Sequence, residues 1–148
     1  MTKSLISERE PFGYLCTLDL YGCKAGVCDN LDLCYQFLED LVEELRMHKQ
    51  SPPFIFRTDA TLYADKAGLS GWVPLIQSGI QIHTLSPKDF ISIDIYSCGS
   101  FSTDTIKEFV QNYFGCKEVE MHYIERGIKY NDIQPHKKSH VHASKSHL

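Results

Sequence analysis

The sequence of 148 residues lacks three features that would each place the protein in a special class. No apolar run approaches the roughly 20 residues that a membrane-spanning helix needs. There is no basic excess, since 15 Lys and Arg stand against 19 Asp and Glu, whereas nucleic-acid-binding surfaces are usually basic. The first residues carry neither an apolar core nor a cleavage signal, so we expect no secretory peptide. We therefore expect a cytoplasmic protein with no membrane and no nucleic-acid partner.

The six cysteines do not follow the spacing of a zinc site or the pattern of a small disulfide scaffold. Cys23, Cys28 and Cys34 have four and then five residues between them, which is not the usual paired arrangement of metal ligands. The chain is also long enough to bury a core without covalent links. We expect reduced, largely buried thiols and no metal site.

Hydrophobic periodicity predicts six strands and two helices in the order βαββββαβ. Alternating or short apolar runs predict strands at 13–21, 53–59, 71–76, 79–85, 90–96 and 117–124. Apolar residues three and four apart predict amphipathic helices at 31–48 and 103–114. Short turns between neighbouring strands favour antiparallel pairing. The fold class that follows is α+β, a two-layer sandwich whose largely antiparallel sheet carries both helices on one face.

This pattern predicts a single domain with polar ends. The α+β domain is expected at residues 13–130, after an N-terminal extension at 1–12. The segment 131–148 is polar and rich in histidine, and we expect it to be disordered.

The segment 68–99 concentrates the side chains that could carry chemistry, namely Ser70, Ser78, His83 and Cys98. A serine in a strained turn can attack the carbonyl before it, and elimination then leaves an N-terminal pyruvoyl group. A pyruvoyl ketone can form a Schiff base with a substrate amine and accept electrons while carbon dioxide leaves. A nearby thiol or imidazole can return the proton. Taken singly, these residues would be a turn serine, a hydrogen-bonded strand histidine and a core thiol.

The order and spacing of these residues resemble the S-adenosylmethionine decarboxylase family in its short prokaryotic form, over roughly residues 13–130. The matching elements are Gly68-Leu69-Ser70-Gly71 with the family's Gly-x-Ser-Gly, Ile82-His83-Thr84 with Ile-His-Thr, and Ile93-Asp94-Ile95 and Cys98-Gly99 with Ile-Asp and Cys-Gly. The resemblance implies a self-cleaving, pyruvoyl-dependent carboxy-lyase that acts on S-adenosylmethionine in spermidine biosynthesis.

The resemblance also implies a role for each site residue. The proenzyme would be cut between Gln77 and Ser78, giving a β chain of residues 1–77 and an α chain of residues 78–148. Ser78 would become the pyruvoyl group, the single cofactor. Ser70 and His83 would assist processing, with His83 as the base, and Cys98 would protonate the decarboxylated product. Family members are dimers, so the implied assembly is a homodimer of processed protomers.

The sequence departs from the family pattern at the cut and in the substrate pocket. The family's Glu-Ser-His is here Gln77-Ser78-Gly79, and its Trp-Pro-Glu after the Ile-His-Thr element is here residues 85–87, Leu-Ser-Pro. The aromatic residue that stacks on adenine falls near Ala64. These departures leave two alternatives: a pyruvoyl-dependent decarboxylase of ornithine or arginine, or an uncleaved, catalytically silent homologue that acts as a regulatory or binding partner.

Overall fold

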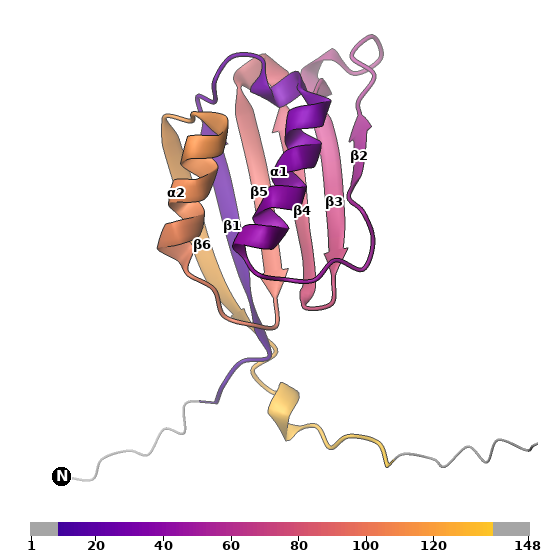
Figure 1. Ribbon diagram of the computed structural model, residues 1–148, viewed down its shortest axis with the longest axis vertical. Helices are drawn as coiled ribbons and strands as arrows, with labels where there is room; N and C mark the ends of the chain where they lie inside the picture. The colour runs from indigo at the N-terminus through magenta and orange to yellow at the C-terminus, as the bar shows by residue number, and fades with distance from the viewer. Residues whose placement is uncertain (1–8, 138–148) are drawn as a thin grey trace, which may run out of the picture.

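A computed structural model describes residues 9–137, which form a six-stranded antiparallel sheet with two helices packed on one face (Figure 1). The strands are β1 Gly13–Tyr21, β2 Phe54–Arg57, β3 Leu69–Leu75, β4 Ser78–Leu85, β5 Phe90–Ser97 and β6 Glu118–Arg126. The helices are α1 Leu31–Glu44 and α2 Thr103–Phe114. The predicted α+β two-layer sandwich and its element order are confirmed.

The strands lie in the order β2-β3-β4-β5-β1-β6, so the first strand of the chain is inserted between β5 and β6. Side chains alternate along each strand between a buried face and a face without helices. In β1, for example, Cys16, Leu18 and Leu20 are fully buried beneath the helices, whereas Thr17 and Asp19 point to the other face. The core therefore lies between the sheet and the helices, and no helix formed by residues 9–137 covers the opposite face of the sheet (Figure 1).

Helix α1 is shorter than the predicted range of 31–48. It begins at the expected cap, where the Asn30 side chain accepts a hydrogen bond from the Leu33 N–H at 3.0 Å. It ends at Glu44 because Arg46 adopts a left-handed φ of 54° and the Met47 N–H turns back to the Val42 carbonyl. The apolar pattern continued past Glu44 because Leu45, the C-cap residue, still packs on the core.

The remaining elements match the predicted ranges or differ from them only at their ends. Helix α2 has the predicted bounds, is capped by the Ser102 hydroxyl and ends at Gly115 with a φ of 58°. The strand predicted at 53–59 is limited to β2, because its pairing with β3 ends at Arg57 opposite Leu69, the first residue of β3. The last strand is longer than predicted, because β6 pairs with β1 as far as Gly13 opposite Arg126.

The two predicted end segments are described only in part. Arg9 of the N-terminal extension lies 2.7 Å from the Asp132 carboxylate, in the short 3-10 turn Tyr130–Asp132 that follows β6. Residues 1–8 and 138–148 lie outside the described residues, and with them most of both segments. Within residues 9–137, no helix is both long enough and apolar enough to cross a membrane.

Candidate functional site

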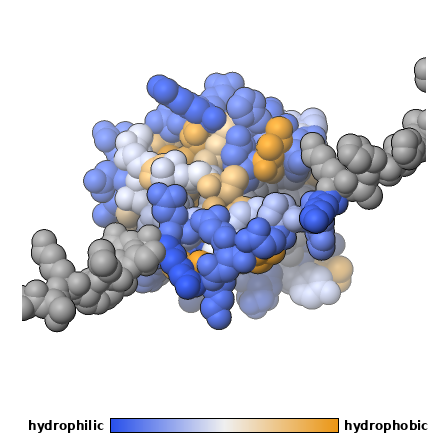
Figure 2. Space-filling view, turned by 90° about the horizontal axis from the view of Figure 1, so that it is seen from below, coloured by the Kyte–Doolittle hydropathy of each residue, from blue (hydrophilic) through white to orange (hydrophobic). Residues whose placement is uncertain are grey.

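The helix-free face of the sheet carries most of the side chains selected from the sequence. Strand pairing sets Ser70 of β3 opposite His83 of β4, and His83 opposite Ser92 of β5. At the end of the sheet from which both chain ends leave, the β3–β4 turn leads into Ser78 (Figure 1). That end is mainly hydrophilic, with separate hydrophobic patches (Figure 2).

Ser70 and His83 are in direct contact. The Ser70 hydroxyl lies 3.0 Å from His83 Nδ1, and the Gln81 side-chain nitrogen lies 2.8 Å from His83 Nε2. A hydroxyl and a side-chain amide can each donate or accept, so the ring is held at both nitrogens whichever of them carries the proton. The pair lines a cavity of about 330 Å³ together with Phe54, Phe56, Gly71, Trp72 and Gln81.

The peptide bond between Gln77 and Ser78 lies in a strained and polarised position. The Ser78 φ is 149°, a region that residues with a Cβ rarely adopt and that costs on the order of 1–3 kcal/mol. The Gln77 carbonyl accepts a hydrogen bond from the Cys98 N–H at 2.9 Å. This donor is in place because Ser78 pairs with the buried Ser97, so the next residue, the exposed Cys98, faces the turn. The arrangement prepares this carbonyl to carry negative charge.

A second cavity of about 460 Å³ lies beside Ser78 and holds groups of both charges. Its lining residues are Leu15, Trp72, Ser78, Gly79, Ile80, Gln81, Asp94, Tyr96 and Arg126. The Arg126 guanidinium lies 4.3 Å from the centre of the Tyr96 ring, a cation–π contact. Burial, and after it the nearby Asp19 carboxylate, raises the pKa of Asp94, while His83 opposes the shift. A carboxyl group and a guanidinium in one cavity can bind the two oppositely charged groups of a zwitterionic ligand.

Trp72 separates the two cavities and was not selected from the sequence. Its ring lines both cavities and stacks on Phe54 with the ring centres 6.0 Å apart. A Cβ added to Gly79 would lie 3.1 Å from the indole nitrogen, so the indole covers the place where residue 79 has no side chain. The only sign of it in the sequence was a single tryptophan on the polar side of a predicted strand. Its direct partner across the strands is Gln81, and Gly79 lies two residues further along. Such a diagonal contact can be predicted only when the strand register is known.

The structure does not bring all four selected residues together within one chain. Ser78 and His83 lie on the same strand, five residues and therefore roughly 16 Å apart, because a strand rises about 3.3 Å per residue. One end of β4 thus holds Ser78 with the Cys98 backbone, and the other end holds His83 with Ser70. The two halves of the expected site are separate in a single copy.

The clustered cysteines are structural in the described part of the chain. Cys23, Cys28 and Cys34 are buried, and burial raises the pKa of the Cys34 thiol to about 12. Among residues 9–137, no group of three or more His, Cys, Asp or Glu side chains has the arrangement of a metal site. The exposed thiol nearest to the strained peptide is that of Cys98.

The fold and the site together define a two-layer α+β protein with a strained serine at a hairpin turn and an open sheet face. Residues 14–127 match the family model described as S-adenosylmethionine decarboxylase. The chain belongs to this family, which confirms the resemblance found in the sequence.

Curated relatives and a solved structure agree with this assignment. The S-adenosylmethionine decarboxylase proenzyme of Thermococcus kodakarensis is 26% identical over 128 residues, which cover 86% of this chain and 85% of the relative. The proenzyme of Clostridium botulinum (strain Loch Maree) is 28% identical over 122 residues, covering 78% of this chain and 94% of the relative. The crystal structure of the adenosylmethionine decarboxylase from Aquifex aeolicus has a TM-score of 0.69 at 24% identity, covering 88% of this chain and 99% of that one, and so shows the same fold.

Buried Thr84 fastens the strand ends that hold Ser70 and His83. Its hydroxyl donates to the Cys28 carbonyl at 2.5 Å and accepts from the Leu69 N–H at 2.8 Å. Thr84 is 2% exposed, so water cannot replace either bond without opening the core.

We predict that Thr84→Val lowers the free energy of unfolding by about 2–3 kcal/mol, because it leaves a buried N–H and a buried carbonyl without partners. Thr84→Ser keeps the hydroxyl and should lose only about 1 kcal/mol, for the missing methyl group. Urea unfolding followed by circular dichroism measures both values. Equal losses in the two variants would contradict the role of the hydroxyl.

Proposed function

We propose that this chain is a self-cleaving, pyruvoyl-dependent decarboxylase that acts on S-adenosylmethionine in polyamine biosynthesis in the cytoplasm. The observation that carries the proposal is the state of one peptide bond: the Gln77 carbonyl is hydrogen-bonded to the Cys98 N–H, and the adjoining Ser78 has a strained φ. A bond under strain whose carbonyl faces a donor is suited to intramolecular attack. The relatives named above are proenzymes, in agreement with a chain that must be cut.

The cleavage uses atoms of the chain and one molecule of water. The Ser78 hydroxyl oxygen attacks the Gln77 carbonyl carbon, the C–N bond between the two residues breaks, and an ester replaces the amide. A base removes the α-proton of Ser78, which expels the Gln77 carboxylate and leaves a dehydroalanine. Addition of water and loss of ammonia then give the pyruvoyl group. The Cys98 N–H stabilises the oxyanion of the first step, because it already points at that oxygen.

The residues around Ser78 fit a pyruvoyl group at this position. The group would begin the α chain beside the cavity of about 460 Å³, where a substrate can reach it. When present, it supplies an electron sink for decarboxylation. Cys98 would hold the proton that is returned to the substrate carbon, because its thiol is exposed next to the strand position opposite Ser78. Asp94 and Arg126 would orient the charged ends of the substrate.

We propose further that two copies share each active site. In one chain, His83 and Ser70 are roughly 16 Å from Ser78 along β4, beyond the reach of proton transfer. A two-fold axis across the helix-free faces would place the Ser70–His83 end of one copy against the Ser78 end of the other, and the reverse. The same face exposes the aromatic side chains of Phe54, Phe56 and Trp72, which favours a covering partner.

The substrate pocket supports the second candidate, a decarboxylase of ornithine or arginine. Ala64 and Pro87 lie in short 3-10 turns and offer neither the aromatic ring nor the carboxylate that the family uses for the nucleoside. The cavity beside Ser78 still holds one acidic and one basic side chain, which suit any amino-acid head group. Release of labelled carbon dioxide from each of the three substrates separates the candidates, and release from none of them by cleaved protein would contradict both.

Denaturing intact-mass measurement tests the cleavage and, with it, the alternative of a silent homologue. We predict that the 16.9 kDa chain becomes two fragments, residues 1–77 and 78–148, the second without a free N-terminal amine. Ser78→Ala should abolish the fragments, because it removes the attacking oxygen, while Ser100→Ala, an exposed serine outside the site, should not. A wild-type chain that stays whole after long incubation at neutral pH would overturn the proposal.

We expect the backbone N–H of Cys98 to act in cleavage and its thiol to act in decarboxylation. Cys98→Ala keeps the N–H that faces Gln77, so we predict cleavage within about twofold of the wild-type rate, as the donor is unchanged. Decarboxylation by the cleaved enzyme should fall by about a hundredfold or more, because the proton donor is lost. Cys116→Ala serves as the matched control. Unchanged turnover in Cys98→Ala would contradict the proton-donor role.

Mixing two inactive variants tests the shared site. Ser78→Ala and His83→Ala should each remain essentially uncut alone. When the two are co-expressed in equal amounts, about half of the His83→Ala chains should be cut, because random pairing puts half of them beside an intact His83. If wild type is cut and the mixture is not, each site lies within one copy, and the shared arrangement is wrong while self-cleavage stands.

A further inference from the structure

Gln77, whose carbonyl faces Cys98, is held on its other side by His48. The His48 N–H donates to the Gln77 side-chain oxygen at 3.1 Å, and the Gln77 side-chain nitrogen lies 3.3 Å from His48 Nδ1. The His48 carbonyl in turn accepts a hydrogen bond from the Ile76 N–H at 2.9 Å. Both residues of the two-residue turn before Ser78 are therefore fixed by one histidine.

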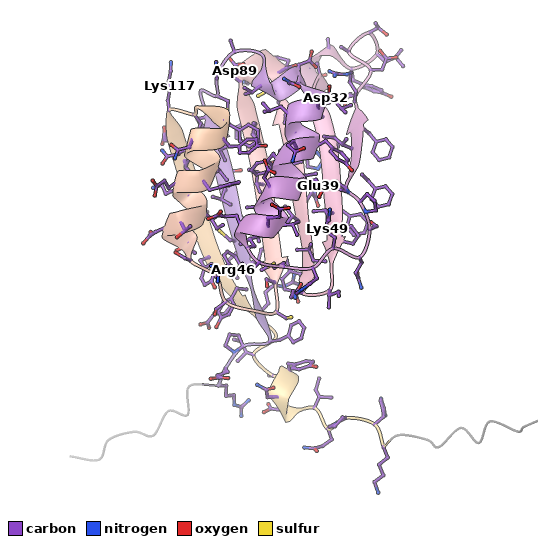
Figure 3. All side chains as sticks on the ribbon, in the orientation of Figure 1. Asp32, Glu39, Arg46, Lys49, Asp89 and Lys117 are labelled. Carbon is purple, nitrogen blue, oxygen red and sulfur yellow. The ribbon has the colours of Figure 1, made fainter. Side chains whose placement is uncertain are left out.

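The end of α1 places His48 beside this turn. After the left-handed Arg46, the half-buried Met47 anchors the chain to the core, and the next residues run along the end of β3. The Gln50 N–H bonds to the Pro74 carbonyl at 2.9 Å, and Lys49 forms an ion pair with Glu39 of α1. Figure 3 shows Glu39 and Lys49 on the helix-covered side, with Arg46 near the end of the helix. The position of His48 is thus set by a well-anchored segment.

We infer that His48 is a positioning residue for the cut between Gln77 and Ser78, an inference that rests on the proposed self-cleavage. Together with Cys98, it holds residue 77 at the backbone carbonyl and at both atoms of the side-chain amide. A turn held at these points cannot rotate its last peptide to relax the Ser78 φ, and the carbonyl keeps its aim at the Cys98 N–H.

The chemistry of the pair explains why glutamine suits this position. A side-chain amide both donates and accepts, so Gln77 accepts from the His48 N–H while it donates to Nδ1. A glutamate here would instead need a proton on Nδ1, because a carboxylate only accepts. The amide of Gln77 therefore pairs with the ring form whose Nδ1 carries a lone pair, in a residue that lies 29 positions earlier in the chain.

The test is the first-order rate of cleavage of newly made full-length chain, followed by pulse–chase labelling in cell-free translation. His48→Ala should be cut about tenfold more slowly, the effect of losing one hydrogen bond. His48→Asn restores an acceptor near the place of Nδ1 and should be cut within about threefold of wild type, a loss smaller than that of a whole bond. Gln50→Ala, which changes an exposed side chain of the same segment and keeps its backbone bond to Pro74, should keep the wild-type rate.

Two further measurements separate positioning from general destabilisation. The urea concentration at the unfolding midpoint should be the same, to within about 10%, for the uncut Ser78→Ala chain and for the same chain that also carries His48→Ala. Gln77→Ala, which keeps the backbone carbonyl, should also slow cleavage, and adding His48→Ala to it should slow it little further, because both changes remove the same side-chain contact.

The outcomes distinguish this inference from the function on which it rests. If wild type is never cut, the proposed self-cleavage fails and the inference fails with it. If wild type is cut and His48→Ala is cut equally fast, the inference alone is wrong. Equal slowing in His48→Ala, His48→Asn and Gln50→Ala would also overturn it, because the segment and not the ring acceptor would then be responsible.

Discussion

The hydrogen bond from the Cys98 N–H to the Gln77 carbonyl is the contact on which the candidate site depends. It exists because β4 and β5 pair up to Ser78 and Ser97, which leaves the next backbone donor directed at the turn. The buried isoleucines of β4 and β5 fix this register, since a slip of one residue would turn them out of the core. Core packing on one face of the sheet thus sets the geometry of the strained peptide bond at its end.

Strand β4 holds the candidate groups at its two ends and does not gather them at one point. Ser70 and His83 form a hydrogen-bonded pair at one end, and Ser78 with the Cys98 backbone lies at the other. An extended strand cannot fold these groups onto each other. This separation is the reason for proposing that two copies together complete each site.

The fold could be predicted from the sequence, because period-two and helical patterns are local. The spacing of Ser70, Ser78, His83 and Cys98 also carried the family resemblance. What the sequence did not show was distance: His83 is close to Ser78 in the chain, yet an extended strand separates them. Local reasoning likewise had no means to pair Gln77 with His48, which meets it only because α1 ends early.

The helix boundary and the cover over Gly79 were missed for a related reason. Leu45 continued the apolar pattern of α1 because it packs on the core from the C-cap position. Trp72 reaches Gly79 diagonally on the neighbouring strand, and that contact depends on a register which the sequence leaves open. In both cases tertiary packing decided the outcome.

The insertion of β1 between β5 and β6 has a consequence for the two pieces that a cut before residue 78 would create. One piece would contain β1, β2, β3 and α1, and the other would contain β4, β5, β6 and α2. In the strand order β2-β3-β4-β5-β1-β6, the first piece would wedge a strand between two strands of the second. Hydrogen bonds from β1 to both β5 and β6 would hold the two pieces together. The covalent break would therefore create a new chain end without separating the pieces.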